Sequence, residues 1–306
     1  MTRSVGGGAP ASRGSGPPSG GRLAPACDAP GMVATGDDPA DVLARFLRAP
    51  PSPGALLVVT GAGVSVASGI PTFRGTDPGA IWKHDVTTLG TFAYFEADPV
   101  GSWRWYLSRF DRVVDAKPNA AHAAIAALER WQSARGGEFL LVTQNVDTLH
   151  ERAGSKAMVK VHGSADRVRC PKRGCRFGAP AGSLPRADFD LAAFTADPRE
   201  ETLPRCPACG AVLRQHVLWF DETYDSHADY EFRRVLLAAG SADRVLYVGT
   251  SFSVGVTDAT LGLARDARAE VLSIDPGSHA APPRVRTLRA PAEQVLPGAV
   301  RALASD

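Results

Sequence analysis

Residues 58–75 read Val58-Val59-Thr60-Gly61-Ala62-Gly63-Val64-Ser65-Val66-Ala67-Ser68-Gly69-Ile70-Pro71-Thr72-Phe73-Arg74-Gly75, an apolar run that leads into a loop of small residues. A buried parallel strand that ends in Gly-x-Gly brings backbone N–H groups, and then a helix N-terminus, close to a pyrophosphate. A generic dinucleotide site continues as Gly-x-Gly-x-x-Gly, whereas here Gly69 comes later and Pro71 follows it. The stretch therefore predicts a nucleotide-binding loop of an unusual kind.

Short, nearly continuous apolar runs recur along the chain and alternate with helical patterns. The runs are 55–59, 139–142, 244–248 and 270–274, and the helical patterns are 38–48, 99–113, 119–131, 229–239 and 256–268. Continuous apolar runs are typical of parallel strands that are covered on both faces. The alternation predicts an α/β fold, a Rossmann-like open parallel sheet with helices on both faces.

Two segments interrupt this alternation. Residues 76–117 are rich in aromatic side chains, and residues 163–215 carry four cysteines among many Pro and Gly residues. We expect them to form a helical insertion and a zinc module, which together build a smaller domain over the carboxyl edge of the sheet, where open α/β sheets bind ligands. The Rossmann-like part then comprises about 36–75, 118–162 and 216–306.

Composition and charge limit the partners of this chain. Residues 1–35 consist largely of Gly, Ser, Pro and Ala, too few apolar groups to offset the entropy of ordering, so a disordered tail is expected. A net charge of +2 gives no strong attraction to nucleic acid, and no apolar run approaches the roughly 20 residues of a membrane helix. We expect a cytoplasmic protein without a specific nucleic-acid or membrane partner; the sequence does not indicate the oligomeric state.

Four of the five cysteines form two closely spaced pairs. Cys170 and Cys175 have four residues between them, and Cys206 and Cys209 have two. Two tight turns that each carry two thiolates can close a tetrahedral Cys₄ zinc site, whose zinc is structural because protein fills every position. Two disulfides are the alternative, which a reducing cytoplasm disfavours. A zinc ribbon can also bind nucleic acid, but this segment has little basic–aromatic interleaving.

Mostly polar residues follow the ends of the other predicted strands. The residues at these ends are Gln144, Asn145, Val146 and Asp147 after the second run, His162 after a short strand, Gly249, Thr250 and Ser251 after the third run, and Asp275 after the fourth. The ends of parallel strands form the ligand-binding edge of such a sheet. Turn formation and helix capping are equally good explanations for the Asn and Asp residues. His122 and His150 lie on helix-like stretches and are interpreted as structural.

Together these motifs resemble the sirtuins, the NAD-dependent protein deacylases, and they occur in the family's order over roughly residues 38–303. The resemblance implies a structural Zn²⁺ and NAD as a consumed co-substrate. It implies His162 and Asn145 as the catalytic residues. The implied cofactor-binding residues are Gly61, Ala62, Gly63, Ser65, Thr72, Phe73, Arg74, Gln144, Asn145, Val146, Asp147, Gly249, Thr250, Ser251 and Asp275, the last of which is usually Asn in the family.

The resemblance also implies a reaction. Nicotinamide leaves, the acyl oxygen of a modified lysine attacks the ribose, His162 takes a proton from the ribose hydroxyls, and water releases lysine and O-acyl-ADP-ribose. Phe73 would shield the reacting carbon, and Arg74 would help to hold the phosphates. Mono-ADP-ribosylation or NAD hydrolysis by the same site, and a non-catalytic NAD or ADP-ribose sensor, are the alternatives. A dehydrogenase is disfavoured by the late third glycine.

Two features concern the acyl-lysine protein substrate. Sirtuins that remove succinyl, malonyl or glutaryl groups have Thr where this chain has Thr72, and a Tyr-x-x-Arg pair that aligns with Tyr106 and Arg109. Residues three apart on a helix face the same way, and a guanidinium can pair with a distal carboxylate. The alternative is an aromatic core helix with Arg109 at its surface. Deacetylation can accompany removal of acidic acyl groups.

The stretch 213–222 resembles the strand and loop that pair with the substrate backbone in sirtuins. The residues implied to contact substrate there are Val217, Trp219 and Phe220. Many sirtuins have Pro at Gln215 and Gly at Asp221. We expect that replacing this Gly restricts a loop conformation that needs positive φ.

Overall fold

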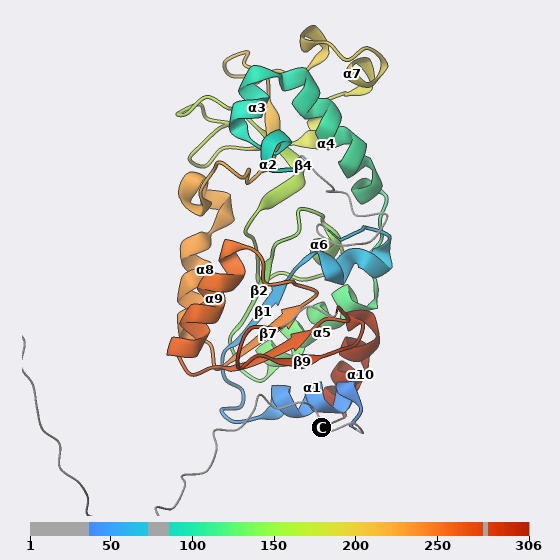
Figure 1. The fold of residues 1–306 in the computed structure, drawn as a ribbon, viewed down its shortest axis with the longest axis vertical. Coiled ribbons are helices and arrows are strands. Elements are labelled where there is room, and N and C mark those ends of the chain that lie inside the picture. The colour runs from blue at the N-terminus through green and yellow to red at the C-terminus, as the bar shows by residue number, and fades with distance from the viewer. Residues whose placement is uncertain (1–36, 73–85, 278–280, 306) are drawn as a thin grey trace, which may run out of the picture.

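The computed structural model describes residues 37–72, 86–277 and 281–305, and Figure 1 shows two β-sheets placed one above the other along the long axis. The larger sheet has six parallel strands in the order β3-β2-β1-β7-β8-β9. These strands are β1 (Leu56–Thr60), β2 (Phe139–Thr143), β3 (Met158–Lys160), β7 (Arg244–Val248), β8 (Glu270–Ile274) and β9 (Arg286–Leu288). All five pairings are parallel, as the continuous apolar runs predicted.

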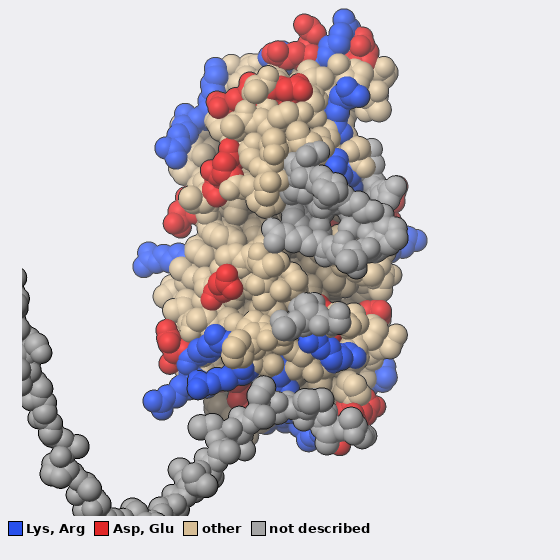
Figure 2. Space-filling view, viewed as in Figure 1, with Lys and Arg blue, Asp and Glu red and all other residues tan. Residues whose placement is uncertain are grey.

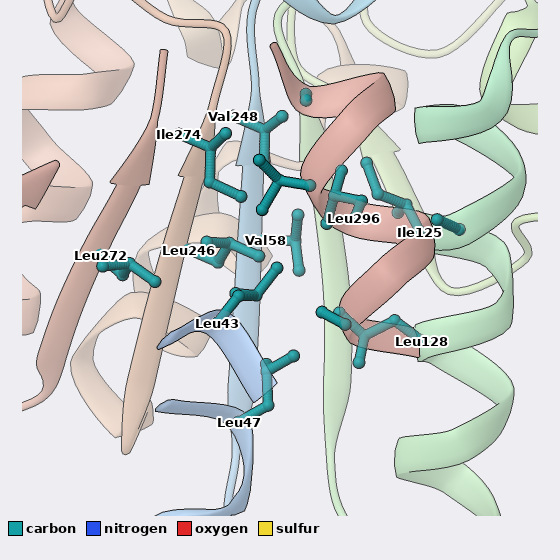
Figure 3. Packing of buried hydrophobic residues seen from close by; sticks show 14 of the residues in the cluster. Leu43, Leu47, Val58, Ile125, Leu128, Leu246, Val248, Leu272, Ile274 and Leu296 are labelled. Atoms are coloured by element: carbon teal, nitrogen blue, oxygen red, sulfur yellow. The ribbon is translucent and has the colours of Figure 1, made fainter. Parts of the chain in front are cut away.

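Helices cover both faces of this sheet (Figure 1). One face packs on α1 (Pro39–Arg48), α5 (Ala120–Ala134) and α10 (Ala292–Ala304), and the other on α8 (Phe232–Ser241) and α9 (Gly255–Asp266). Successive side chains of β1 point to opposite faces of the sheet. Val58 packs in the hydrophobic cluster with α1, α5 and α10, and Val59 packs in the cluster with α8 and α9. Figure 3 shows Val58 and Leu246 of the sheet gathered with Leu43 of α1 and Leu296 of α10. The doubly covered sheet that was predicted is therefore confirmed.

The smaller sheet has three antiparallel strands in the order β5-β4-β6. Its strands are β4 (Gly163–Arg169), β5 (Leu184–Pro185) and β6 (Arg214–Val217), and the helices near it are α2 (Val86–Leu89), α3 (Phe92–Ala97), α4 (Pro99–Val114) and α7 (Ala192–Ala196). Trp103 from the aromatic segment and Phe194 from the cysteine-bearing segment lie in one hydrophobic cluster, with their ring centroids 6.4 Å apart. The two interrupting segments thus share one core.

Short elements complete the described chain. A four-residue helix, α6 (Leu149–Arg152), follows β2, and the 3₁₀ turns are η1 (Ala62–Ser68), η2 (Arg186–Asp188), η3 (Glu200–Thr202), η4 (Tyr224–Ser226) and η5 (Ala228–Tyr230). Asp38 caps α1, since its carboxylate accepts from the N–H of Ala40 at 2.9 Å.

Strand β9 and helix α10 are additional to the elements expected from sequence. β9 has only three residues, and α10 contains Pro297, which lacks the N–H that a helix interior uses. The next residue, Gly298, allows close packing on α1, because a Cβ there would lie 2.8 Å from the Cβ of Ala40. Helix α8 also begins later than expected, since residues 228–230 form η5.

Figure 2 shows Lys and Arg side chains interspersed with Asp and Glu side chains on one face of the molecule. This mixture matches the small net charge of +2. Among the helices of the described residues, none combines the length and apolarity that crossing a membrane requires.

Leu246 in the centre of the large sheet is fully buried, so Leu246→Ala should leave a cavity and reduce the free energy of unfolding by about 3 kcal/mol. Leu237 on α8 is 65% exposed, and Leu237→Ala should change the free energy of unfolding by less than about 0.5 kcal/mol. Urea unfolding of the two variants checks this. Equal effects would contradict the packing described here.

Candidate active site

A cavity of about 1070 Å³ lies at the carboxyl ends of the parallel strands. Strands β1, β2, β7 and β8 end in register, because Thr60 pairs with both Thr143 and Val248, and Val248 pairs with Ile274. The residues that follow these strands therefore reach the cavity side by side. The sequence-predicted residues that line it are Gly61, Ala62, Gly63, Ser65, Thr72, Tyr106, Arg109, Gln144, Asn145, Val146, Asp147, His162, Val217, Trp219, Phe220, Gly249, Thr250, Ser251 and Asp275. Phe73 and Arg74 lie outside the described residues.

The glycines after β1 allow two loops to touch. The N–H groups of Gly61 and Gly63 donate to the carbonyls of Val248 and Gly249 at 3.0 and 2.9 Å. A Cβ at Gly63 would lie 2.6 Å from the Cα of Gly249. These two N–H groups are thus engaged within the protein rather than turned to a pyrophosphate, and the glycines serve close packing of the loops that border the cavity.

The chain after Gly61 forms the short turn η1 instead of the long helix of a generic dinucleotide site. Gly69 ends this turn with φ of 83°, a conformation that suits glycine. Its N–H donates to the carbonyl of Val66 at 2.9 Å, and the chain then passes to Ile70, Pro71 and Thr72 along the cavity wall.

Ser65, Asn145 and Asp147 form a buried hydrogen-bonded cluster at the cavity. The hydroxyl of Ser65 donates to Oδ2 of Asp147 at 2.9 Å, and Nδ2 of Asn145 donates to that hydroxyl at 3.0 Å. Oδ1 of Asp147 accepts from the N–H of Leu149 in α6 at 3.0 Å. Asp147 thus combines the capping that sequence allowed with a place in the polar lining of the cavity.

The two histidines interpreted as structural lie behind this cluster. His122 is buried and closes a capping box with Asn119 at the start of α5. Burial lowers the pKa of His122 to about 4, against the opposing effect of Asp147. His150 is also buried, with its Nε2 3.1 Å from the hydroxyl of Thr60. Both histidines are buried, and both contact the segments around the cavity without lining it. We therefore interpret them as supports of the loops.

His162 follows β3 and lines the cavity, with its Nδ1 2.8 Å from the carbonyl oxygen of Gln144. A carbonyl only accepts, so Nδ1 carries the proton and the lone pair lies on Nε2. Burial lowers the pKa of His162, and the hydrogen bond to the Gln144 carbonyl opposes that shift. Gln144 is itself fixed by its N–H, which donates to the carbonyl of Thr60 at 2.9 Å. The imidazole is therefore held neutral, in the form that can accept a proton.

Aromatic side chains form the other end of the cavity. Tyr106 is buried against Trp219, with ring centroids 6.0 Å apart. The guanidinium of Arg109 lies 4.3 Å from the ring centre of Trp105 and donates to the Trp105 carbonyl at 3.0 Å. Burial raises the pKa of Tyr106 and lowers that of Arg109. Tyr106 and Arg109 both line the cavity, which places a phenol and a cation together at this end.

The four paired cysteines come together beside the small sheet. Sγ of Cys170 lies 3.5 Å from Sγ of Cys209, and Sγ of Cys175 lies 3.7 Å from Sγ of Cys206. All four Sγ atoms lie within 4.8 Å of one another, and the four thiols are free. A tetrahedral zinc with bonds of about 2.3 Å needs sulfur atoms roughly 3.8 Å apart, so this donor set fits Zn²⁺.

Comparison with known proteins agrees with this geometry. The model of the Sir2 family matches residues 61–256. The protein named NAD-dependent protein deacylase 1 from Pseudomonas aeruginosa is 40% identical over 247 residues, which cover 80% of this chain and 93% of that protein. The chain belongs to the Sir2 family, the sirtuins.

Two further relatives support the membership in the Sir2 family. A Thermus thermophilus protein named NAD-dependent protein deacylase is 43% identical over 198 residues, which cover 64% of this chain and 69% of that protein. A crystal structure of a Sir2 homolog–NAD complex superimposes with a TM-score of 0.69 at 33% identity and covers 87% of this chain and 94% of its own.

A buried ion-pair network supports the aromatic end of the cavity in this sirtuin. The guanidinium of Arg214 forms two hydrogen bonds to the carboxylate of Glu222, at 2.7 and 3.0 Å, and Arg169 donates to the same carboxylate at 2.6 Å. Burial alone would raise the pKa of Glu222, but the guanidinium groups outweigh it and lower the pKa. Because the Arg214 guanidinium lies 3.2 Å from the ring centre of Trp219, the network holds that ring in place.

Asp221 lies in the loop after β6. Among the described residues, the non-glycine residues with positive φ are Glu231, Phe252, Arg268 and Arg284, so Asp221 does not adopt the conformation that glycine would allow. The Asp221 carboxylate instead accepts from the N–H groups of Phe92 and Ala93, at 2.7 and 3.0 Å, at the start of α3. It ties the loop after β6 to the helical insertion.

A second cluster with metal-ligand chemistry lies between β6 and η5. Oδ2 of Asp229 is 3.1 Å from Nε2 of His216 and 3.7 Å from Nδ1 of His227. Both nitrogens of His227 are engaged, because Nε2 is 3.1 Å from the carbonyl oxygen of Gly182 and Nδ1 accepts from the N–H of Asp229. Burial lowers the pKa of His216 to about 4. We interpret this cluster as a hydrogen-bonded support rather than a metal centre.

Several residues that line the cavity were not expected from sequence. Glu293, in the first turn of α10, belongs to a helix that the sequence pattern did not predict. Tyr224 follows the loop after β6, and nothing near it in the sequence marks it as different from a core aromatic residue. No motif or spacing in residues 220–228 specifies which side chain points into the cavity.

Asp221→Ala removes the acceptor from two N–H groups at the start of α3 and should reduce the free energy of unfolding by about 1 kcal/mol. Asp225→Ala, at a nearby exposed aspartate, should change the free energy of unfolding by less than about 0.5 kcal/mol. Urea denaturation measures both. An Asp221 variant as stable as the Asp225 variant would rule out the capping role.

Proposed function

We propose that this chain is an NAD-dependent protein deacylase, which removes acyl groups from lysine side chains and releases nicotinamide and O-acyl-ADP-ribose. The observation that carries the proposal is one cavity lined by the nucleotide loop, Asn145, His162 and the aromatic end. The names of the bacterial relatives, at 40% and 43% identity, support the same activity.

The cavity suits an NAD molecule in both size and lining. At about 1070 Å³ it extends from the Asp147 side of the β2 end to Asp275 and Glu293 beyond β8. We assign the ribose to Asp275, by the carboxylate–diol pairing common in Rossmann-like sites, and the phosphates to the loop 249–251. NAD supplies a ribose carbon that becomes electrophilic when nicotinamide leaves. Asn145 and Asp147, held rigidly through Ser65, would bind the nicotinamide half.

His162 is assigned the role of general base. Its Nδ1 proton is committed to the Gln144 carbonyl, so only Nε2 can take a proton from a ribose hydroxyl. The lowered pKa keeps the imidazole neutral at physiological pH. The resulting imidazolium is stabilised by the same Gln144 carbonyl, which limits the energetic cost of accepting the proton.

We further propose that acidic acyl groups are preferred. Tyr106 and Arg109 line the same end of the cavity, where a distal carboxylate could pair with the guanidinium and the phenol. The partly buried position of Arg109 strengthens such a pair, because less water competes with it. Val217, Trp219 and Phe220 would contact the substrate lysine and its backbone.

The remaining assignments belong to the same proposal. For the Rossmann-like part, the helical insertion and the zinc module we propose the boundaries expected from sequence. We also propose acyl-lysine proteins as the partners, without a specific nucleic acid or a membrane. A cytoplasmic location belongs to the same proposal, because cysteine pairs at metal-ligand spacing are typical of a reducing compartment. ADP-ribosyl transfer, NAD hydrolysis and a non-catalytic sensor are the competing outcomes of the tests below.

His162→Ala should abolish NAD-dependent loss of the acyl group from a lysine peptide while NAD still binds, because the base is lost and the nucleotide loops remain. Mass spectrometry of the peptide and calorimetry of NAD binding measure the two properties. Unchanged turnover would refute the assigned role of His162. A gain of ADP-ribose mass on the peptide would favour transferase activity, and NAD binding without nicotinamide release by the unaltered protein would favour a sensor.

Arg109→Met should reduce desuccinylation at least about tenfold more than deacetylation, since only the succinyl group loses a charge-assisted partner. Arg104→Met, at an exposed arginine of the same helix, is the matched control and should leave both rates unchanged. Rates on acetyl-, succinyl- and malonyl-lysine peptides test this. Equal losses on all peptides would reject the acidic-acyl pocket but leave the deacylase assignment intact.

A further inference from the structure

The side chain of Tyr224 meets His162 inside the cavity. Its hydroxyl oxygen lies 3.3 Å from Nε2 of His162, and the two rings stack with centroids 5.8 Å apart and an interplanar angle of 24°. Tyr224 lines the same cavity as His162, from the turn η4. A residue far from His162 in sequence therefore contacts the nitrogen that carries its lone pair.

The direction of this hydrogen bond follows from the neighbouring groups. Nδ1 of His162 donates to the Gln144 carbonyl, so Nε2 can only accept, and the hydroxyl of Tyr224 must be the donor. The backbone N–H of Val256, in the first turn of α9, acts on the phenol oxygen and opposes the rise of its pKa. Tyr224 thus connects the start of α9 to His162, and His162 contacts the end of β2 through the Gln144 carbonyl.

Packing holds the phenol ring in this position. The ring of Tyr224 stacks on Phe232 of α8, with centroids 4.3 Å apart and planes 15° apart. On α9, a Cβ at Gly255 would lie 3.7 Å from the Tyr224 ring, so the start of that helix is in contact with it. Contacts with α8 and α9, two helices that cover the large sheet, therefore hold the Tyr224 hydroxyl in position.

We propose that Tyr224 is a positioning residue for the base: before the nucleotide binds, its hydroxyl holds the Nε2 lone pair of His162 toward the cavity and favours the neutral imidazole. A ribose hydroxyl then replaces the Tyr224 hydroxyl as the donor to Nε2. This inference rests on the proposed function for the assignment of His162 as the base, but the resting hydrogen bond itself is independent of any substrate.

The arrangement has a consequence for the acid–base behaviour of His162. A hydrogen bond donated to Nε2 stabilises the neutral ring, which adds to the effect of burial in lowering the pKa. An imidazolium would lose this hydrogen bond, because its protonated Nε2 has no lone pair with which to accept. Burial raises the pKa of Tyr224, with a smaller contribution from the carboxylate of Asp258 in α9, and this keeps the hydroxyl protonated as a donor.

Titration of the histidine resonances by NMR, without NAD or peptide, tests the resting hydrogen bond. The protein has seven histidines, and the resonance missing from His162→Ala identifies the one of interest. Tyr224→Phe keeps the stacked ring and removes the donor, so the midpoint of His162 should move to higher pH. Tyr247→Phe removes a different buried hydroxyl, which lies 3.0 Å from Thr260, and should leave that midpoint unchanged. An unchanged or lower midpoint in Tyr224→Phe would overturn the proposal.

The pH dependence of kcat/KM for NAD provides the second arm. The acid limb of the Tyr224→Phe profile should move up by about 0.5 to 1 pH unit, the size of one lost hydrogen bond, while that of Tyr247→Phe stays in place. A uniform loss of rate at every pH, with no movement of the limb, would indicate a merely structural residue. If the NMR midpoint moves but His162→Ala remains active, the hydrogen bond stands and the proposed function fails.

Discussion

The common register of the four central strands determines the rest of the site. Strands β1, β2, β7 and β8 all end at one level, so four separate segments begin their loops at the same edge of the sheet. Gln144, Gly249 and Asp275 are far apart in sequence and meet for this reason alone. A shift of one strand by one residue would turn its side chains to the opposite face and separate these groups.

Close contact between the loops is the second constraint. The segments after β1 and β7 approach so tightly that Gly63 and Gly249 leave no room for a Cβ on either side. This contact uses the N–H groups that a generic dinucleotide loop would offer to phosphate. Polar contacts to a ligand in the cavity must therefore come from side chains. Among these are Ser65, Asn145 and Asp147, which hydrogen-bond to one another.

Sequence patterns predicted the parts of the fold whose cause is local. Continuous apolar runs specify strands with two covered faces, and paired cysteines at short spacing specify a metal-binding turn, because neither depends on distant residues. Asp221 could not be interpreted in the same way, since its partners at the start of α3 are about 130 positions away in the chain. α10 was missed because Pro297 and Gly298 are poor helix formers whose position is stabilised by packing on α1.

The sequence by itself determined the class of the sheet, the paired thiols and the polar residues that end each strand, because hydrophobic periodicity and ligand spacing are properties of neighbouring residues. Only the tertiary structure decided which of those residues share a cavity, which way the imidazole of His162 carries its proton, and that Tyr224 contacts it. These depend on strand register and on helices packed from both faces, and the distances and directions that result are not encoded in any one segment.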